Sequence, residues 1–203
     1  MEPLRSKIVA TGSFVPTKVV KNEDMTQFPP AATLLIAAKT GVRERRHASE
    51  GECTSDLAAH AAKAALAKAN MAPDCVDCIV LATSSPDRIH PATATRVQHE
   101  IGATRAFAFD LNSVCTGGIY ALAVADAFIR TGLCKNALVI ASEVYSKFLN
   151  REDISTYPYF GDGAGAVLLE ASHTGEGLQN VLLRSDGSGA DVIQVPGGGS
   201  MKP

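Results

Sequence analysis

The stretch from Phe107 to Thr131, FAFDLNSVCTGGIYALAVADAFIRT, decides the fold because it contains a strand, a turn and a helix in succession. The mostly apolar residues 107–111 predict a buried strand, and the alanine-rich residues 117–131 predict the helix that follows it. Further strands are predicted at Cys78–Thr83 and Asn136–Ser142. Apolar strands that alternate with helices are typical of a mainly parallel sheet with helices on both faces. The sequence therefore predicts the α/β class.

Other segments extend this pattern in both directions. Residues 54–70 predict a helix capped by Thr54 or Ser55. Residues 163–170 predict another strand, and residues 181–185 the start of one more. The predicted buried face of the helix consists of Leu57, Ala58, Ala61, Ala65, Leu66 and Ala69.

The composition is that of a folded chain. Of the 203 residues, 46% are hydrophobic and 20% charged, which excludes disorder as a global state. Lys and Arg number 19 against 21 Asp and Glu, so a net charge of −2 leaves no basic excess for binding nucleic acid. Alanine accounts for 31 of the 203 residues. This excess indicates helices that pack closely against a sheet.

The sequence leads us to expect a cytoplasmic protein. No segment approaches the roughly 18 uninterrupted apolar residues of a membrane span, so we expect no membrane association. The N-terminal residues lack the apolar core and cleavage site of a signal peptide. The five cysteines are an odd number in a chain large enough to need no disulfides, which favours a reducing compartment.

Cys115 is the candidate for covalent chemistry. It lies between a predicted strand and a predicted helix, where unpaired backbone N–H groups and the helix dipole favour a thiolate. The same N–H groups can hold an oxyanion during acyl transfer. Gly117 and Gly118 allow close approach of substrate and backbone. The alternative is a small buried cysteine that caps the helix and has no chemical role.

Four segments carry a family resemblance: TGVRER at 40–45, NSVCTGG at 112–118, FGDGAGA at 160–166 and SDGS at 185–188. Together they resemble β-ketoacyl-acyl-carrier-protein synthase III, the initiating condensing enzyme of fatty acid synthesis, which has relatives in polyketide pathways. The resemblance implies a thiolase-like, layered α-β-α-β-α fold of two duplicated βαβαβ halves, usually as a homodimer. It implies that residues 1–172 form the half that carries the nucleophile and that residues 173–203 begin the second half, which is incomplete.

The resemblance also implies a ping-pong acyltransferase without a cofactor or a metal. Cys115 would take an acyl group from acyl-CoA or an acyl-carrier protein. Malonyl-acyl-carrier protein would then lose CO₂, and its carbanion would condense with the acyl group. The family's catalytic His and Asn belong to His-Gln-Ala-Asn and Asn-Thr-Ser segments, and neither segment is present in these 203 residues.

Two positions depart from the pattern of members that use coenzyme A. Leu35 occupies the place of a Trp that stacks on the adenine, and Ile154 the place of an Arg, so stacking and cation–π contacts are lost. Lys39 keeps a positive charge where an Arg would contact a phosphate. We expect weak binding of coenzyme A or a protein-bound donor, unless the variable residues 26–38 shift the alignment.

The residues expected to line the acyl pocket also differ from the family pattern. By the resemblance, Tyr145 and Phe160 occupy pocket-lining positions. His90 falls where an aromatic residue often reaches across the dimer. These residues are expected to change the length or polarity of the accepted acyl group.

Several alternatives remain at this stage. One is an acyltransferase that passes the acyl group to a hydroxyl or amine, and another is a non-catalytic partner subunit, against which the intact Cys115 counts. A nucleotide loop at Gly161–Gly165 is rejected because strand-like residues follow it, where that motif requires a helix. A zinc site at Cys75 and Cys78 is rejected because no second pair of ligands accompanies them.

Overall fold

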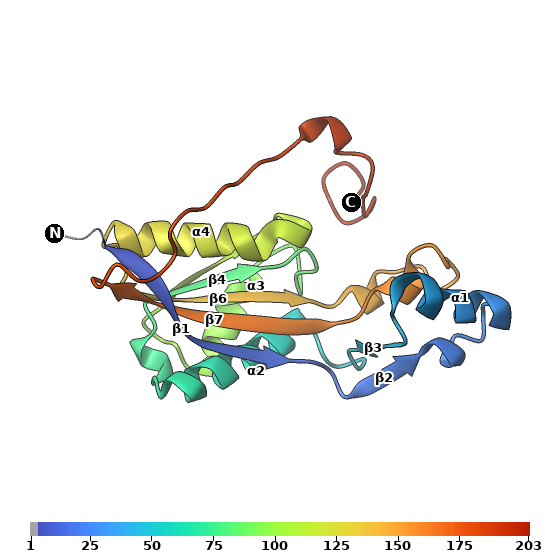
Figure 1. Cartoon of the computed structure of the whole chain (residues 1–203), viewed down its shortest axis with the longest axis horizontal. Coiled ribbons are helices and arrows are strands. Elements are labelled where there is room, and N and C mark those ends of the chain that lie inside the picture. The colour runs from blue at the N-terminus through green and yellow to red at the C-terminus, as the bar shows by residue number, and fades with distance from the viewer. Residues whose placement is uncertain (1–3) are drawn as a thin grey trace.

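The computed structural model describes residues 4–203, which form a five-stranded sheet with helices on both faces and a smaller lobe at one end (Figure 1). The sheet has the strand order β1-β7-β6-β4-β5. Its strands are β1 (Arg5–Phe14), β4 (Cys78–Ala82), β5 (Phe107–Leu111), β6 (Asn136–Glu143) and β7 (Gly163–Ser172). The helices that cover it are α2 (Thr54–Ala69), α3 (Thr93–Ile101) and α4 (Gly117–Arg130), and the smaller lobe contains β2 (Lys18–Lys21), α1 (Pro30–Thr40) and β3 (Glu44–His47).

The sheet is mixed, so the prediction of a mainly parallel sheet is wrong in part. Strand β4 pairs in parallel with both β5 and β6, whereas β7 pairs antiparallel with β6 and with β1. The physical reason is the connection between β6 and β7, which contains no crossover α-helix, so the chain reverses direction there. The predicted α/β class is confirmed, and the described residues build one α-β-α sandwich.

Strand β4 lies at the centre of the sandwich and is buried at every residue. Because side chains alternate along a strand, its residues serve two cores. Ile79 and Leu81 pack in the core beneath α2 and α3, whereas Val80 packs with Ala125 and other residues of α4 on the opposite face. Figure 1 shows these helices on opposite sides of the sheet. A continuous apolar run in the sequence thus corresponds to a strand covered on both faces.

Helix α2 matches its predicted range closely, but its cap does not. The cap residue is Cys53, whose backbone N–H donates to the Asp56 carboxylate at 2.7 Å. Thr54, one of the predicted caps, instead donates its hydroxyl to the Ser85 carbonyl at 2.5 Å. Five of the six residues on the predicted buried face of α2 are buried, and Ala69 is half-buried. The small residues of this face let the helix lie directly on the sheet.

Several helices and strands of the structure were not predicted from the sequence. Strands β1, β2 and β3 and helices α1 and α3 were not predicted, while the strand expected at residues 181–185 is an extended loop outside the sheet. After β7 the chain leaves the sandwich and arches over α4 (Figure 1). Among residues 4–203, no helix is both long enough and apolar enough to cross a bilayer.

Candidate active site

Cys115 lies in a short 3₁₀ turn, Val114–Thr116, that joins strand β5 directly to helix α4. Its side chain is exposed, so the alternative of a buried cysteine is wrong. Val114, just before it, has a φ of +46°, a left-handed conformation that is strained for a β-branched residue. At Gly117 an added Cβ would lie 3.3 Å from the Ala82 Cβ, so the start of α4 lies close to the end of β4. The thiol therefore sits on a tight turn at the N-terminal end of a helix.

The site forms beyond the carboxyl ends of the three parallel strands. Cys115 follows β5, Ser84 follows β4, and Glu143 ends β6. The strand ends are in register, with Ala82 paired to Leu111 on one side and to Ala141 on the other. In open α/β sheets, ligands bind at the carboxyl ends of the strands. The fold therefore brings these three side chains to the place where a substrate site is expected.

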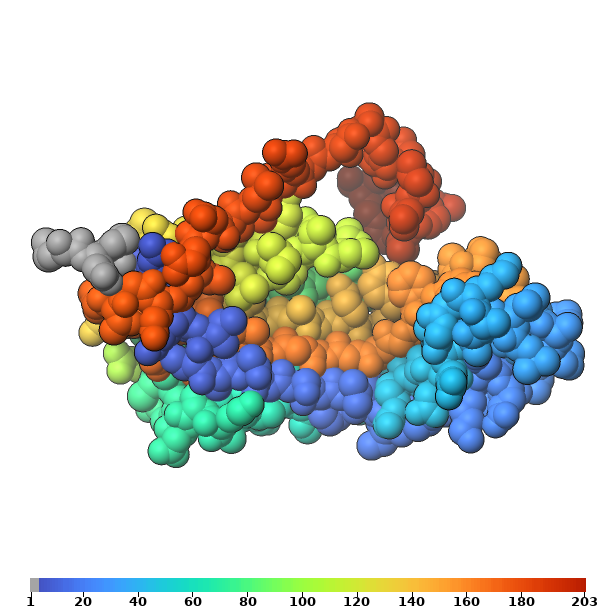
Figure 2. Space-filling view, in the orientation of Figure 1, coloured from blue at the N-terminus to red at the C-terminus, as the bar shows by residue number. Residues whose placement is uncertain are grey.

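A cavity of about 350 Å³ opens beside Cys115. A second hollow of about 490 Å³ on the adjoining surface shares Cys115 and Gly118 with it and extends over β6 and β7. Figure 2 shows the C-terminal segment arching above this face of the molecule, and Ile193 of that segment lines the first cavity. The first cavity is lined by Ala82, Ser84, Val114, Cys115, Gly118, Ala141, Glu143, Tyr145, Phe160, Gly161 and Ile193.

The structure brings together two of the predicted pocket residues. Tyr145 and Phe160 line the cavity with Cys115, and their rings stack with centroids 5.4 Å apart and planes inclined by 21°. The sequence patterns did not identify Ser84 and Glu143, which line the same cavity. The available signal was their position, because Glu143 ends one buried apolar strand and Ser84 lies two residues after the end of another.

The other predicted site residues lie elsewhere and do not line this cavity. Leu35 and Lys39 are exposed on α1 in the smaller lobe, and Ile154 is on the surface of the loop between β6 and β7. His90 is exposed in the loop that connects β4 to α3. None of these four residues contributes to the wall of the cavity.

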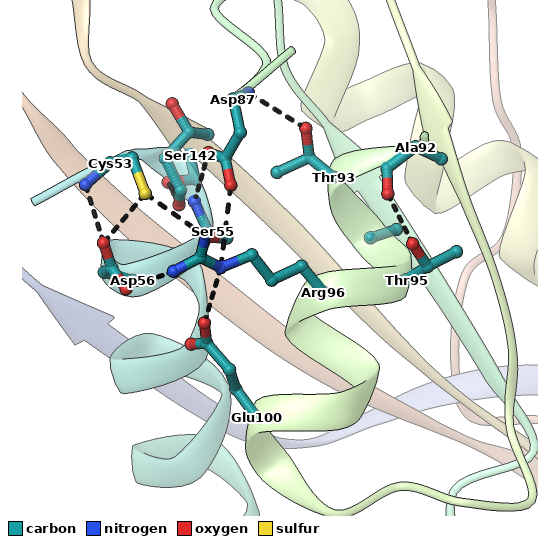
Figure 3. Close-up of polar contacts among 12 residues, drawn as sticks. Cys53, Ser55, Asp56, Asp87, Ala92, Thr93, Thr95, Arg96, Glu100 and Ser142 are labelled. Carbon is teal, nitrogen blue, oxygen red and sulfur yellow. Dashed lines mark hydrogen bonds and ion pairs between the residues drawn. The ribbon is translucent and has the colours of Figure 1, made fainter. Parts of the chain in front are cut away.

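The loop after β4 is anchored by a cluster of charges on α2 and α3 (Figure 3). Arg96 of α3 forms ion pairs with Asp56, Asp87 and Glu100. Asp87 accepts a hydrogen bond from the Ser55 N–H at 3.0 Å. Exposed ion pairs stabilise weakly, so the value of this cluster is that it fixes a loop bearing Ser84 at one end.

The cysteines other than Cys115 and Cys75 are poorly suited to nucleophilic chemistry. Burial raises the pKa of the Cys78 thiol to about 12, with a further contribution from neighbouring Cys134. Burial and the hydrogen bond to the Asp56 carboxylate also raise the pKa of Cys53. Across residues 4–203 no group of three or more His, Cys, Asp or Glu side chains could hold a metal ion.

The GDG segment at 161–163 contributes Gly161 to the wall of the cavity. Asp162 is buried and accepts hydrogen bonds from the Ala48 N–H at 2.7 Å, the Ser146 N–H at 2.9 Å and the Ser146 hydroxyl. Gly163 then begins strand β7. This segment therefore joins the smaller lobe to the sheet, and its glycines do not open a phosphate-binding helix.

His47 lies beside this segment, and its burial leads us to predict that the stability of the protein depends on pH. Burial lowers the pKa of His47 below its usual 6.5, which outweighs the opposing effect of Asp162. The unfolded chain therefore binds a proton at this residue more readily than the folded chain does. The free energy of unfolding is expected to fall as the pH drops below about 6.5. Urea unfolding at pH 7.5 and 5.5 should show a smaller fall for His47→Asn, whereas His173→Asn, at an exposed histidine, should behave like the unmodified chain. Equal falls in all three proteins would contradict this prediction.

Comparison with known proteins agrees with this geometry. Residues 109–187 match the family model described as 3-oxoacyl-[acyl-carrier-protein (ACP)] synthase III. The β-ketoacyl-[acyl-carrier-protein] synthase III of Rhodospirillum centenum is 47% identical over 202 residues, which cover 98% of this chain and 62% of that protein. The chain thus spans about three fifths of the length of the curated relatives it matches.

Solved structures show the same fold. The crystal structure of 3-oxoacyl-[acyl-carrier-protein] synthase III from Aquifex aeolicus is 43% identical, with a TM-score of 0.79 over 83% of this chain and 54% of that chain. Another 3-oxoacyl-(acyl-carrier-protein) synthase III structure is 35% identical, with a TM-score of 0.91 over 98% of this chain and 60% of that chain. The α/β sandwich of the described residues is therefore a fold that these solved structures share.

Proposed function

We propose that the chain is a member of the 3-oxoacyl-[acyl-carrier-protein] synthase III family and acts as an acyltransferase of the condensing type, which is supported by its 47% identity to such a protein over 98% of its own length and by the family match of residues 109–187. Cys115 takes an acyl group from a thioester and passes it to a malonyl-type thioester, in fatty acid or polyketide synthesis. The observation that carries this proposal is an exposed thiol at the N-terminal end of α4, facing a largely apolar cavity.

The reaction proceeds through two bond exchanges. In the first, the Cys115 sulfur forms a bond to the acyl carbon, the bond from that carbon to the carrier sulfur breaks, and the carrier leaves as a thiolate that takes up a proton. In the second, a malonyl-type thioester loses CO₂, and its α-carbon displaces the Cys115 thiolate. The N-terminal end of α4 supports the first step because its dipole favours negative charge on sulfur.

The substrates and partners follow from the same proposal. We propose acyl-CoA or an acyl-carrier protein as donor, malonyl-acyl-carrier protein as extender, and the cytoplasm as the compartment. A homodimer is supported by strand β5, which forms an edge of the sheet and exposes 41% of Phe107.

We further propose that residues 1–172 are the first thiolase-like half and that residues 173–203 begin the second. The end of the sheet at Ser172 supports this division.

Mass spectrometry of the intact chain tests the loading step. After incubation with butyryl thioesters, we expect a mass increase of one butyryl group per chain, which peptide mapping assigns to Cys115. Cys75 is the matched control, because it is also exposed but lies outside the cavity. Loading on Cys75 at the same rate would mean that the thioester reacts with any accessible thiol, and the proposal would fail.

The exposed leucine on α1 predicts a donor preference. Because Leu35 cannot stack on adenine, we expect loading from acyl-carrier protein to be faster than loading from acyl-CoA. Leu35→Trp should raise the rate from acyl-CoA by about fivefold or more, the size of one base–aromatic stack, and leave the carrier-protein rate unchanged. Leu34→Trp is the control, since Leu34 is its neighbour and is even more exposed. Rapid loading of the unmodified chain from acyl-CoA would contradict this interpretation.

A further inference from the structure

Glu143 is a carboxylate in the wall of the cavity whose acceptor capacity is filled by the loop after β4. One oxygen accepts from the Ser84 N–H at 2.9 Å and from the Ser84 hydroxyl at 2.8 Å. The other oxygen accepts from the Thr83 hydroxyl at 3.4 Å and from the Ser85 hydroxyl. A carboxylate offers about four acceptor sites, so Glu143 has none left for a substrate. Its role is therefore to hold the protein groups around it.

The hydrogen-bond directions connect Glu143 to Tyr145. An ionised carboxylate only accepts, so the single hydroxyl proton of Ser84 points to Glu143. The Ser84 oxygen lies 2.8 Å from the Tyr145 hydroxyl, and with its own proton committed it must accept the proton of Tyr145. The sequence Tyr145 to Ser84 to Glu143 is thus a directed chain of two hydrogen bonds.

This chain of bonds fixes an aromatic wall. The Tyr145 ring is held at its hydroxyl by Ser84 and along its face by stacking on Phe160. Both rings border the cavity beside Cys115, whose other lining residues are mostly small or aliphatic. With its hydroxyl anchored, the ring cannot turn away from the cavity, so it limits the depth available to an acyl group.

We propose that Glu143 is a positioning residue that, through Ser84, anchors the Tyr145 ring and so sets the longest acyl group the cavity accepts. This inference rests on the proposed function, since it assigns a specificity to the loading of Cys115. Glu143 acts through its neighbours and does not touch the acyl group.

The test compares loading of butyryl and octanoyl thioesters on the intact chain. Glu143→Gln replaces one acceptor oxygen with an NH₂ donor, so the Ser84 and Ser85 hydroxyls can no longer both donate. Ser84→Ala and Tyr145→Phe break the same anchor at its other two members. Each variant should raise the octanoyl-to-butyryl rate ratio by about threefold to tenfold, the equivalent of one lost hydrogen bond. Glu152→Gln and Tyr159→Phe, at exposed residues outside the cavity, should leave the ratio unchanged.

A double-variant cycle separates positioning from a general structural role. If both residues act through one anchor, Glu143→Gln/Tyr145→Phe should change the ratio no more than either single variant does. The proposal would be overturned if the change in the rate ratio in the double variant equalled the product of the two single changes. It would also be overturned if the variants loaded both donors equally slowly and had a lower melting temperature. A normal ratio in Glu143→Gln with Cys115 still loading would overturn it and leave the proposed function intact. No loading of the unmodified chain would overturn both.

Discussion

Replacing Cys115 with alanine is expected to abolish acyl loading of the chain. The side chain that forms the covalent bond is then missing, and the other thiols cannot take over its position in the cavity. Cys115→Ser should still fold and keep a nucleophilic atom on the turn, but a hydroxyl has no appreciable anion at neutral pH without a base. We expect its loading to be slower by on the order of 10⁴-fold or more. Intact-mass time courses with a butyryl thioester measure both variants.

The cysteine controls make this experiment decisive. Cys75→Ala removes the other exposed thiol and should load at the unmodified rate. The burial that raises the pKa of Cys78 and Cys134 keeps those two thiols protonated at neutral pH. If Cys115→Ala acquires the same adduct as the unmodified chain, the assignment of the nucleophile is wrong.

Replacing Gly12 with alanine is expected to cause the largest loss of stability. Gly12 lies on β1 where the strand packs against helix α2. A Cβ at this position would lie 2.2 Å from the Ala61 carbonyl oxygen and 2.4 Å from the Ala65 backbone nitrogen. Both are backbone atoms in the middle of a helix, so no side chain can move aside to relieve the clash. We expect the free energy of unfolding to fall by about 3 kcal/mol or more, at the upper end for overpacking.

Gly165→Ala is the matched control for this prediction. Gly165 lies on β7, directly opposite Ser13 of β1, and an added Cβ there meets no atom within 4 Å. Urea unfolding followed by circular dichroism should place this variant within about 1 kcal/mol of the unmodified chain. Similar losses for Gly12→Ala and Gly165→Ala would show that β1 does not lie against α2 as described.

The central elements that the sequence predicted have a burial that is visible in the local pattern, whereas β5, predicted as a buried strand, is an edge strand without a buried residue. Strand β4 is a continuous apolar run buried on both faces, and α2 has small apolar residues at helical spacing. Helix α1 lacked such a signal because it buries only Ile36. Strand β1 was not predicted because only Ser6 and Ala10 on it are buried and because its pairing partner, β7, lies about 150 residues further along the chain.

The residues of the site also fall into two groups, those that could be predicted from the local sequence and those whose proximity only the structure shows. The Cys115 turn could be read from sequence because a strand, a nucleophile and two glycines follow one another within a few residues. The pairing of Ser84 with Glu143 could not, since their neighbourhood depends on the parallel register of β4 and β6, in which Ala82 lies opposite Ala141. The positions of Leu35, Lys39, His90 and Ile154 away from the cavity also depended on how the smaller lobe and the loops pack.

The α/β class, the central strands and the cysteine on which the proposed chemistry rests could be predicted from the sequence, because they depend on the spacing of apolar and small residues along short segments. The tertiary structure alone decided the direction of β7, the wall of the cavity and the hydrogen bonds that join Tyr145 to Glu143. The difference arises because sequence patterns report on neighbouring residues, whereas these features depend on contacts between distant segments. A local pattern shows which face of a segment avoids water, but which distant segment covers that face depends on the packing of the whole chain.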